Sequence, residues 1–141
     1  MTINQISIFL ENKFGRLNEI LSILSKENLR VITATVADTS DYGILRLITS
    51  NQPKALQLLK ENGVSANLNT VMAISVDSSM GKIAETIEYF TKGGISIEYM
   101  YCFSINQKSV LILRTNNIDA ANDVIRRYSL NNLSEAELNS L

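Results

Sequence analysis

The chain has 141 residues, of which 45% are hydrophobic and 19% are charged, a composition typical of a folded globular protein. Its 13 basic and 14 acidic residues give a net charge of −1, which argues against nucleic-acid binding because that binding depends on clustered basic charge. The absence of histidine excludes Ser-His-Asp and Cys-His catalytic sites and metal sites with histidine ligands.

The first half of the chain predicts elements in the order strand, helix, strand, strand, helix, strand. Alternating apolar residues indicate the first strand, and a stripe of leucine and isoleucine at helical spacing begins after Gly15. Pro53 suits the first turn of the second helix, and Gly63 suits its C-terminal cap. The predicted elements are a strand at 5–10, a helix from 15, strands at 29–37 and 44–49 joined by a hairpin at 38–43, a helix at 52–62 and a strand within 64–68.

The second half repeats this order. Gly93 and Gly94 end its first helix, and Asn106-Gln107 marks a hairpin between its second and third strands. A helical turn is expected near Ser134, after a short last strand. The predicted elements are a strand at 71–76, a helix at 81–92, strands at 95–103 and 109–114, a helix at 117–128 and the short strand and helical turn within 130–141.

A shift of 66 residues aligns the two halves without a gap and places Ile6 on Met72 and Gly15 on Gly81. Apolar character persists at many aligned positions, although few residues are identical. Because each β-α-β crossover is right-handed, this order gives an antiparallel sheet with both helices on one face. We therefore predict an α+β protein of two tandem ferredoxin-like βαββαβ units, with domains at residues 1–69 and 70–141 that adjoin almost directly.

The turn between the first strand and the first helix has the same pattern in both halves. Residues 11–17 and 77–83 each contain a short side-chain oxygen, a glycine three residues later, a basic residue and the first apolar residue of the helix. Asn12 and Ser78 are favourable N-cap residues, and a helix N-terminus offers N–H groups that suit a carboxylate. A purely structural turn explains the same pattern, because a strand-to-helix turn favours a cap and often a glycine.

These turns resemble the signature of the ACT domain family, small βαββαβ regulatory modules that bind amino acids. Gly-Arg-Leu at 15–17 and Gly-Lys-Ile at 81–83 match the glycine and the apolar residue of the family pattern. Asn12 and Ser78 stand at its acidic position and keep an oxygen acceptor. The run Gly-Ile-Ser-Ile at 94–97 is close to the one with which the family enters its second strand.

The resemblance implies that a ligand lies between paired domains, held by the first turn and the start of the second strand. Phe14 and Met80 replace the proline of the family pattern in the two halves. The implied ligand-binding residues are Asn12, Lys13, Phe14, Gly15, Arg16, Leu17, Val31 and Ile32 in the first half, and Ser78, Ser79, Met80, Gly81, Lys82, Ile83, Ser96 and Ile97 in the second.

The function that the resemblance implies is regulatory rather than enzymatic. We expect a protein that senses a free amino acid or a similar small carboxylate, with no cofactor, metal ion or catalytic residue. We also expect a homo-oligomer whose partner is a separately encoded enzyme or transporter, and no binding of nucleic acid or membrane. Residues 1–5 lack the features of a signal peptide, and no stretch approaches roughly 18 apolar residues, so we expect a cytoplasmic protein.

Three alternatives use the same order of elements. Acylphosphatases, which are small enzymes, resemble the chain in topology, but only Arg16 after Gly15 matches their phosphate-binding turn. RNA-recognition modules use aromatic residues on their central strands, and the segments 44–48 and 110–113 contain none. A protein-interaction module that binds no ligand is the third alternative.

The strand predicted at 95–103 carries two further features. Tyr99, Tyr101 and Phe103 alternate on one face, where they form either an aromatic ligand wall or part of a sheet core or domain interface. Cys102 is the single cysteine, so an intramolecular disulfide is excluded, and its neighbours predict a buried thiol.

Overall fold

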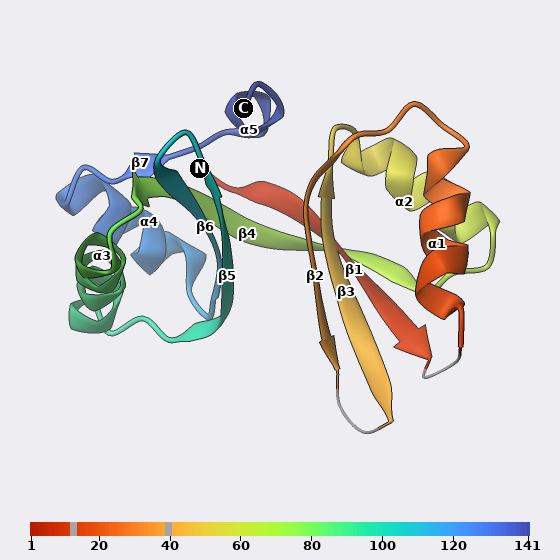
Figure 1. Cartoon of the computed structure of the whole chain (residues 1–141). Coiled ribbons are helices and arrows are strands. Elements are labelled where there is room, and N and C mark those ends of the chain that lie inside the picture. Colours follow the sequence, from red (N-terminus) through yellow and green to blue (C-terminus); the bar gives the residue numbers. More distant parts are fainter. Residues whose placement is uncertain (12–13, 39–40) are drawn as a thin grey trace. The chain divides into compact units, whose positions relative to one another are not determined.

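The computed structural model describes residues 1–11, 14–38 and 41–141. The β-α-β-β-α-β order occurs twice along the chain, with one long strand serving both copies (Figure 1). The first elements are β1 (Ile3–Glu11), α1 (Arg16–Ser25), β2 (Val31–Asp38), β3 (Tyr42–Thr49) and α2 (Gln52–Glu61). They are followed by β4 (Ala66–Asp77), α3 (Met80–Lys92), β5 (Ile97–Ile105), β6 (Lys108–Thr115), α4 (Ile118–Arg127), β7 (Asn131–Asn132) and α5 (Glu135–Asn139).

The chain divides into two compact units. The first unit comprises Asn4–Asn69, and the second comprises Thr70–Leu141 together with Met1–Ile3. No helix in the described part of the chain is long and apolar enough to cross a membrane.

The first three residues join the second unit through contacts of the N-terminus. The Met1 ammonium group donates to Asn122 Oδ1 at 2.8 Å, and the Met1 carbonyl accepts from Asn132 Nδ2 at 2.8 Å. Residues 1–3 were predicted to belong to the first domain, because the alternating apolar pattern of β1 does not reveal these contacts.

In the first unit, β3 pairs antiparallel with β1 on one side and with β2 on the other. The start of β4 lies beside β1, where the Phe9 N–H donates to the Ser65 carbonyl at 3.2 Å. Helices α1 and α2 lie on the same face of this sheet (Figure 1). The core between sheet and helices is made of buried aliphatic residues, among them Ile6, Ile8, Ile20, Leu45 and Leu59.

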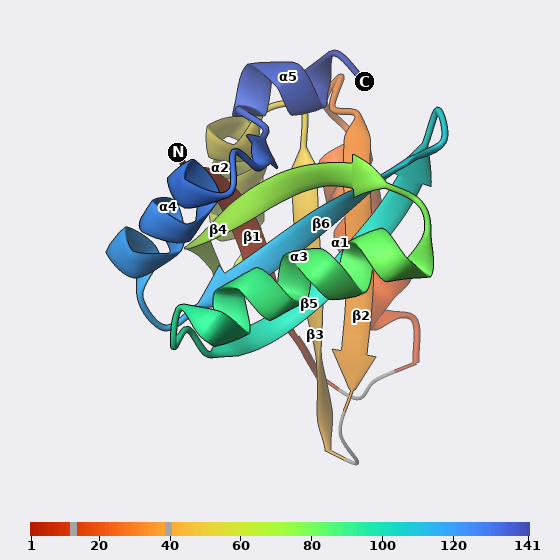
Figure 2. The ribbon, with the colours of Figure 1, turned by 90° about the vertical axis from the view of Figure 1, so that its left-hand side faces the viewer.

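In the second unit, β6 pairs antiparallel with β4 and with β5, and β7 pairs with the other edge of β4. Helices α3 and α4 lie on the same face of this sheet (Figure 2). The core contains Met72, Ile74, Phe90, Leu111 and Leu113. The predicted α+β fold, with antiparallel ferredoxin-like sheets that carry their helices on one face, is therefore confirmed.

Strand β4 is longer than the sequence suggested. Separate strands were expected within 64–68 and at 71–76, whereas the structure has one strand of 12 residues. The two predicted domains were expected to adjoin at Asn69 and Thr70, and the structure continues the strand through both residues. In the strand the Asn69 side chain instead accepts a hydrogen bond from the Ser7 hydroxyl.

The hairpin and the C-terminal helical turn of the second half are confirmed. Asn106 and Gln107 have φ angles of 52° and 64°, the left-handed values that a tight hairpin turn requires at both central residues. Helix α5 begins with a capping box in which Ser134 N donates to the Glu137 carboxylate at 2.7 Å and Glu137 N donates to the Ser134 hydroxyl at 3.1 Å. The backbone hydrogen bond from Ser134 lowers the pKa of Glu137.

Strand β5 lies at one end of the strand order, and its side chains alternate between half-buried and exposed along the strand. Cys102 is exposed, and the prediction of a buried thiol is therefore wrong. Tyr99, Tyr101 and Phe103 are half-buried on the other face. Both roles considered for these aromatic residues stay predictions.

A buried glutamine connects the start of α2 to two strands of the first unit. Gln52 is 4% exposed, and both ends of its side-chain amide are hydrogen-bonded. Its Oε1 accepts from Thr49 N at 2.9 Å and from Thr49 Oγ1 at 2.8 Å. Its Nε2 donates to the carbonyls of Asn4 at 2.7 Å and Leu47 at 3.3 Å.

We expect Gln52→Leu to lower the free energy of unfolding by about 1–3 kcal/mol, because buried carbonyl and N–H groups lose their partner. Urea unfolding measures this change. Ile118, at the aligned position of the second unit, is 37% exposed, and Ile118→Leu is the matched control with an expected change within about 0.5 kcal/mol. A Gln52→Leu protein as stable as the parent would contradict this account of α2.

Candidate functional site

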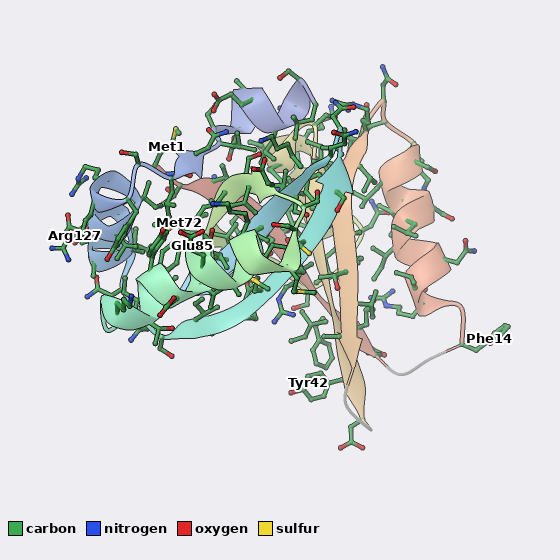
Figure 3. All side chains as sticks on the ribbon, turned by 60° about the vertical axis from the view of Figure 1, so that its left-hand side comes forward. Met1, Phe14, Tyr42, Met72, Glu85 and Arg127 are labelled. Carbon is green, nitrogen blue, oxygen red and sulfur yellow. The ribbon has the colours of Figure 1, made fainter. Side chains whose placement is uncertain are left out.

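The first corner, between β1 and α1, is formed around a left-handed glycine. Gly15 is the N-cap residue of α1 with φ 80° and makes no side-chain cap, so the prediction of Asn12 as the N-cap is wrong. Asn12 and Lys13 lie outside the described residues. The side chain of Phe14 is fully exposed and projects away from α1 (Figure 3).

Arg16 is the charged residue of this corner. Its guanidinium group pairs with Glu19 Oε1 at 3.3 Å, and its side chain is 18% exposed. Its Nε is buried and has no hydrogen-bond partner among the described residues. Leu17, one residue later, is 39% exposed. The first corner therefore combines a buried donor with exposed apolar surface.

The second corner, between β4 and α3, has a different cap. Ser79, rather than the predicted Ser78, is the N-cap residue, and its hydroxyl accepts from Lys82 N at 3.3 Å. The Ser78 hydroxyl accepts instead from the Ser109 hydroxyl at 3.3 Å. Because Ser79 caps it, α3 begins at Met80. In the alignment of the two halves, this is two positions earlier than the start of α1. Met80 is 79% exposed.

The two aligned glycines have different structural roles. Gly15 has a positive φ that disfavours any side chain. Gly81 lies inside the first turn of α3, and a Cβ atom placed there would meet nothing within 4 Å. The fold therefore explains Gly15 but gives no reason for glycine at position 81.

The other predicted residues lie at the far end of each sheet. In the first unit β3 pairs Glu11 with Tyr42 but Val31 with Thr49. In the second unit, β6 runs antiparallel to both of its neighbours in the same way, so the corner and Ile97 lie at opposite ends of the sheet. A strand of eight residues such as β6 spans more than roughly 20 Å. Within one unit, the strand-start residues Val31, Ile32, Ser96 and Ile97 are therefore not brought to the corner of that unit.

Ion pairs surround the second corner. The Lys108 ammonium group donates to the Asp77 carboxylate, and this hydrogen bond lowers the pKa of Asp77. Glu85 accepts from the Tyr89 hydroxyl at 2.6 Å and from Lys82 Nζ at 3.3 Å. The hydrogen bond with Tyr89 lowers the pKa of Glu85 and raises the pKa of Tyr89. Both carboxylates are therefore charged at neutral pH, and the tyrosine is neutral.

An open pocket of about 340 Å³ lies against these charges. We call it the α3 pocket; it is lined by α3, the end of β4, the first residue of β6 and the segment 128–131 before and within β7. Lys82 is its one predicted ligand residue. The pocket residues Lys108, Tyr89 and Tyr128 were not predicted from the sequence, because they come together only through the β4–β6 register and the packing of α3 beside α4.

A smaller pocket of about 160 Å³ lies in the first unit beside Phe9. The Phe9 ring stacks on Tyr42 with centroids 5.1 Å apart. None of the predicted ligand residues lines it. Among the described residues, no group of histidine, cysteine, aspartate and glutamate is arranged to hold a metal ion.

The fold and its two corners define a protein built from paired ferredoxin-like modules. The model of the ACT domain pair family matches residues 1–141, and the chain belongs to this family. The recognition of ACT domains in the sequence is therefore confirmed.

Solved structures share this fold. Protein BT0572 from Bacteroides thetaiotaomicron has a TM-score of 0.95 and 36% identity, with 100% of this chain and 98% of that chain covered. The ligand-free regulatory subunit of aspartate kinase from Thermus thermophilus has a TM-score of 0.62 and 15% identity, with 90% and 96% covered. The corresponding subunit from Thermus flavus has a TM-score of 0.60 and 16% identity, with 90% and 94% covered. No curated protein gives a significant match.

The two glycines predict opposite effects of alanine on stability. We expect Gly15→Ala to lower the free energy of unfolding by about 1–2 kcal/mol, because alanine is strained at a left-handed φ. We expect Gly81→Ala to raise it by about 0.4–1 kcal/mol, because alanine fits the helix and restricts the unfolded chain. Urea unfolding of both variants measures the difference. A loss of stability in Gly81→Ala would show that the fold itself requires this glycine.

Proposed function

We propose that this chain is a regulatory protein that binds a free amino acid, and that binding controls a separately encoded enzyme or transporter. The match of residues 1–141 to the ACT domain pair carries the proposal, since ACT domains are regulatory modules that bind amino acids. The names of two proteins with the same fold, both regulatory subunits of aspartate kinase, support a regulatory role.

The corners support recognition of the ligand carboxylate. The N-terminus of α3 offers N–H donors and the positive end of the helix dipole. The Lys82 N–H already donates to the Ser79 hydroxyl. Glycine at position 81 leaves open space beside the first turn. In the first unit, the buried Nε of Arg16 is a further donor. A carboxylate is the small group that suits such donors.

The apolar residues at the corners suit the ligand side chain or a regulated partner. Phe14 and Met80 occupy aligned positions, and both are highly exposed. Folding gains nothing from an apolar side chain that stays in water. We propose that both side chains form contacts when the ligand or the partner binds.

The separation of each corner from the strand-start residues supports the proposal of an oligomer. A ligand that contacts a corner and residues such as Ser96 and Ile97 needs a second domain or a second copy of the chain. Such a ligand would stabilise the associated state over the separated one, which is the differential affinity that regulation requires. We propose only the class of the regulated partner, a separately encoded enzyme or transporter.

A thermal-shift screen with the twenty amino acids tests the proposal. A ligand present at 100 times its Kd stabilises the folded state by about 2.7 kcal/mol, which raises Tm by several degrees. The amide of the same amino acid, which lacks the carboxylate charge, is the control and is expected to give no shift. A screen without any shift would leave a protein-interaction module as the better proposal.

A further inference from the structure

The α3 pocket carries charges of both signs in equal number. Asp77 pairs with Lys108, and Lys82 pairs with Glu85 at 3.3 Å. The four side chains are 45% to 60% exposed. Exposed ion pairs of this kind each contribute little to stability, typically 0–1 kcal/mol. A ligand with both an anionic and a cationic group can therefore replace the partners in these ion pairs at a small cost in free energy.

The wall of the pocket beside these charges is aromatic. The rings of Tyr89 and Tyr128 stack with centroids 3.8 Å apart and an interplanar angle of 8°. The Tyr89 hydroxyl donates to Glu85 at 2.6 Å and so fixes the carboxylate next to the ring. A flat aromatic surface beside a held charge suits a ligand with an apolar or aromatic group close to an ammonium group.

The first unit lacks this combination at the aligned positions. Arg16 and Glu19 keep the ion pair equivalent to Lys82 and Glu85. The positions of Lys108, Tyr89 and Tyr128, however, hold Tyr42, Ile23 and Asn62. Ile23 is part of the first core. The lysine and both tyrosines thus belong to the second unit alone.

We propose that the α3 pocket binds one free α-amino acid with an apolar or aromatic side chain, as its zwitterion. Lys82 and Lys108 hold the α-carboxylate, Glu85 holds the α-ammonium group, and the side chain lies against the tyrosine pair. The inference takes its ligand class partly from the proposed function. It places the ligand on the helix-covered side of one unit, apart from the strand-start residues of the family pattern.

The first test is titration of the labelled full chain with L-phenylalanine, followed by NMR of the backbone amides. We expect chemical-shift changes centred on residues 128–131 and Lys108. Phenylalaninamide and 3-phenylpropanoate each lack one charge, and we expect each to bind at least about tenfold more weakly. Shift changes that leave Lys108 and residues 128–131 unaffected, or no binding of L-phenylalanine, would overturn the inference.

The second test compares variants by calorimetry. We expect Lys108→Gln and Tyr128→Ala each to raise the Kd for L-phenylalanine by about tenfold or more. Arg126→Gln is the matched control, because Arg126 forms an exposed ion pair with Asp123 on α4 outside the pocket. We expect the Arg126→Gln protein to keep the parent Kd.

Calorimetry of Gly81→Ala beside the variants of the second test separates this inference from the proposed function. If Gly81→Ala weakens amino-acid binding while Lys108→Gln and Tyr128→Ala do not, the ligand binds at the corner, and the inference is wrong while the proposed function stands. If the parent binds none of the twenty amino acids, both are wrong. Because the NMR titration uses the unmodified chain, a variant that fails to fold does not prevent a decision.

Discussion

The antiparallel pairing of β3 and β6 with both of their neighbours is the constraint on which the rest of the structure depends. This pairing sends the two flanking strands of each unit in the same direction. The corner that follows the first strand and the start of the second strand consequently lie at opposite ends of the sheet. A small ligand cannot contact both within one unit, so a ligand that contacted both would need a second domain or a second copy of the chain.

Strand and helix order was predictable because it depends on local periodicity. Apolar residues such as Ile6 and Ile8 alternate on a strand, and those of the helices recur at helical spacing. The capping positions were less predictable, since Ser78 and Ser79 are equally good caps by composition. The continuity of β4 was missed because Asn69 resembles a turn residue in sequence and finds its partner, Ser7, far along the chain.

The two corners show how one repeated pattern produces two local structures. In the first, α1 begins after a left-handed Gly15; in the second, α3 begins at Met80 because Ser79 caps it. Gly81 thereby enters the helix, where glycine is usually disfavoured by roughly 0.5–1 kcal/mol relative to alanine. The backbone conformation therefore requires the shared glycine in the first copy only. In the other copy, the fold gives no reason for the glycine.

Helix α3 connects the two surfaces proposed to bind ligands in the second unit. Its first turn holds Met80, Gly81 and Lys82 at the corner, and the following turns carry Glu85 and Tyr89, which line the α3 pocket together with Lys82. A helix of 13 residues moves largely as a rigid element. Lys82 belongs to both surfaces, so its ammonium group cannot serve two carboxylates equally well at once. Binding at one surface would therefore weaken binding at the other, and by thermodynamic linkage the effect is reciprocal.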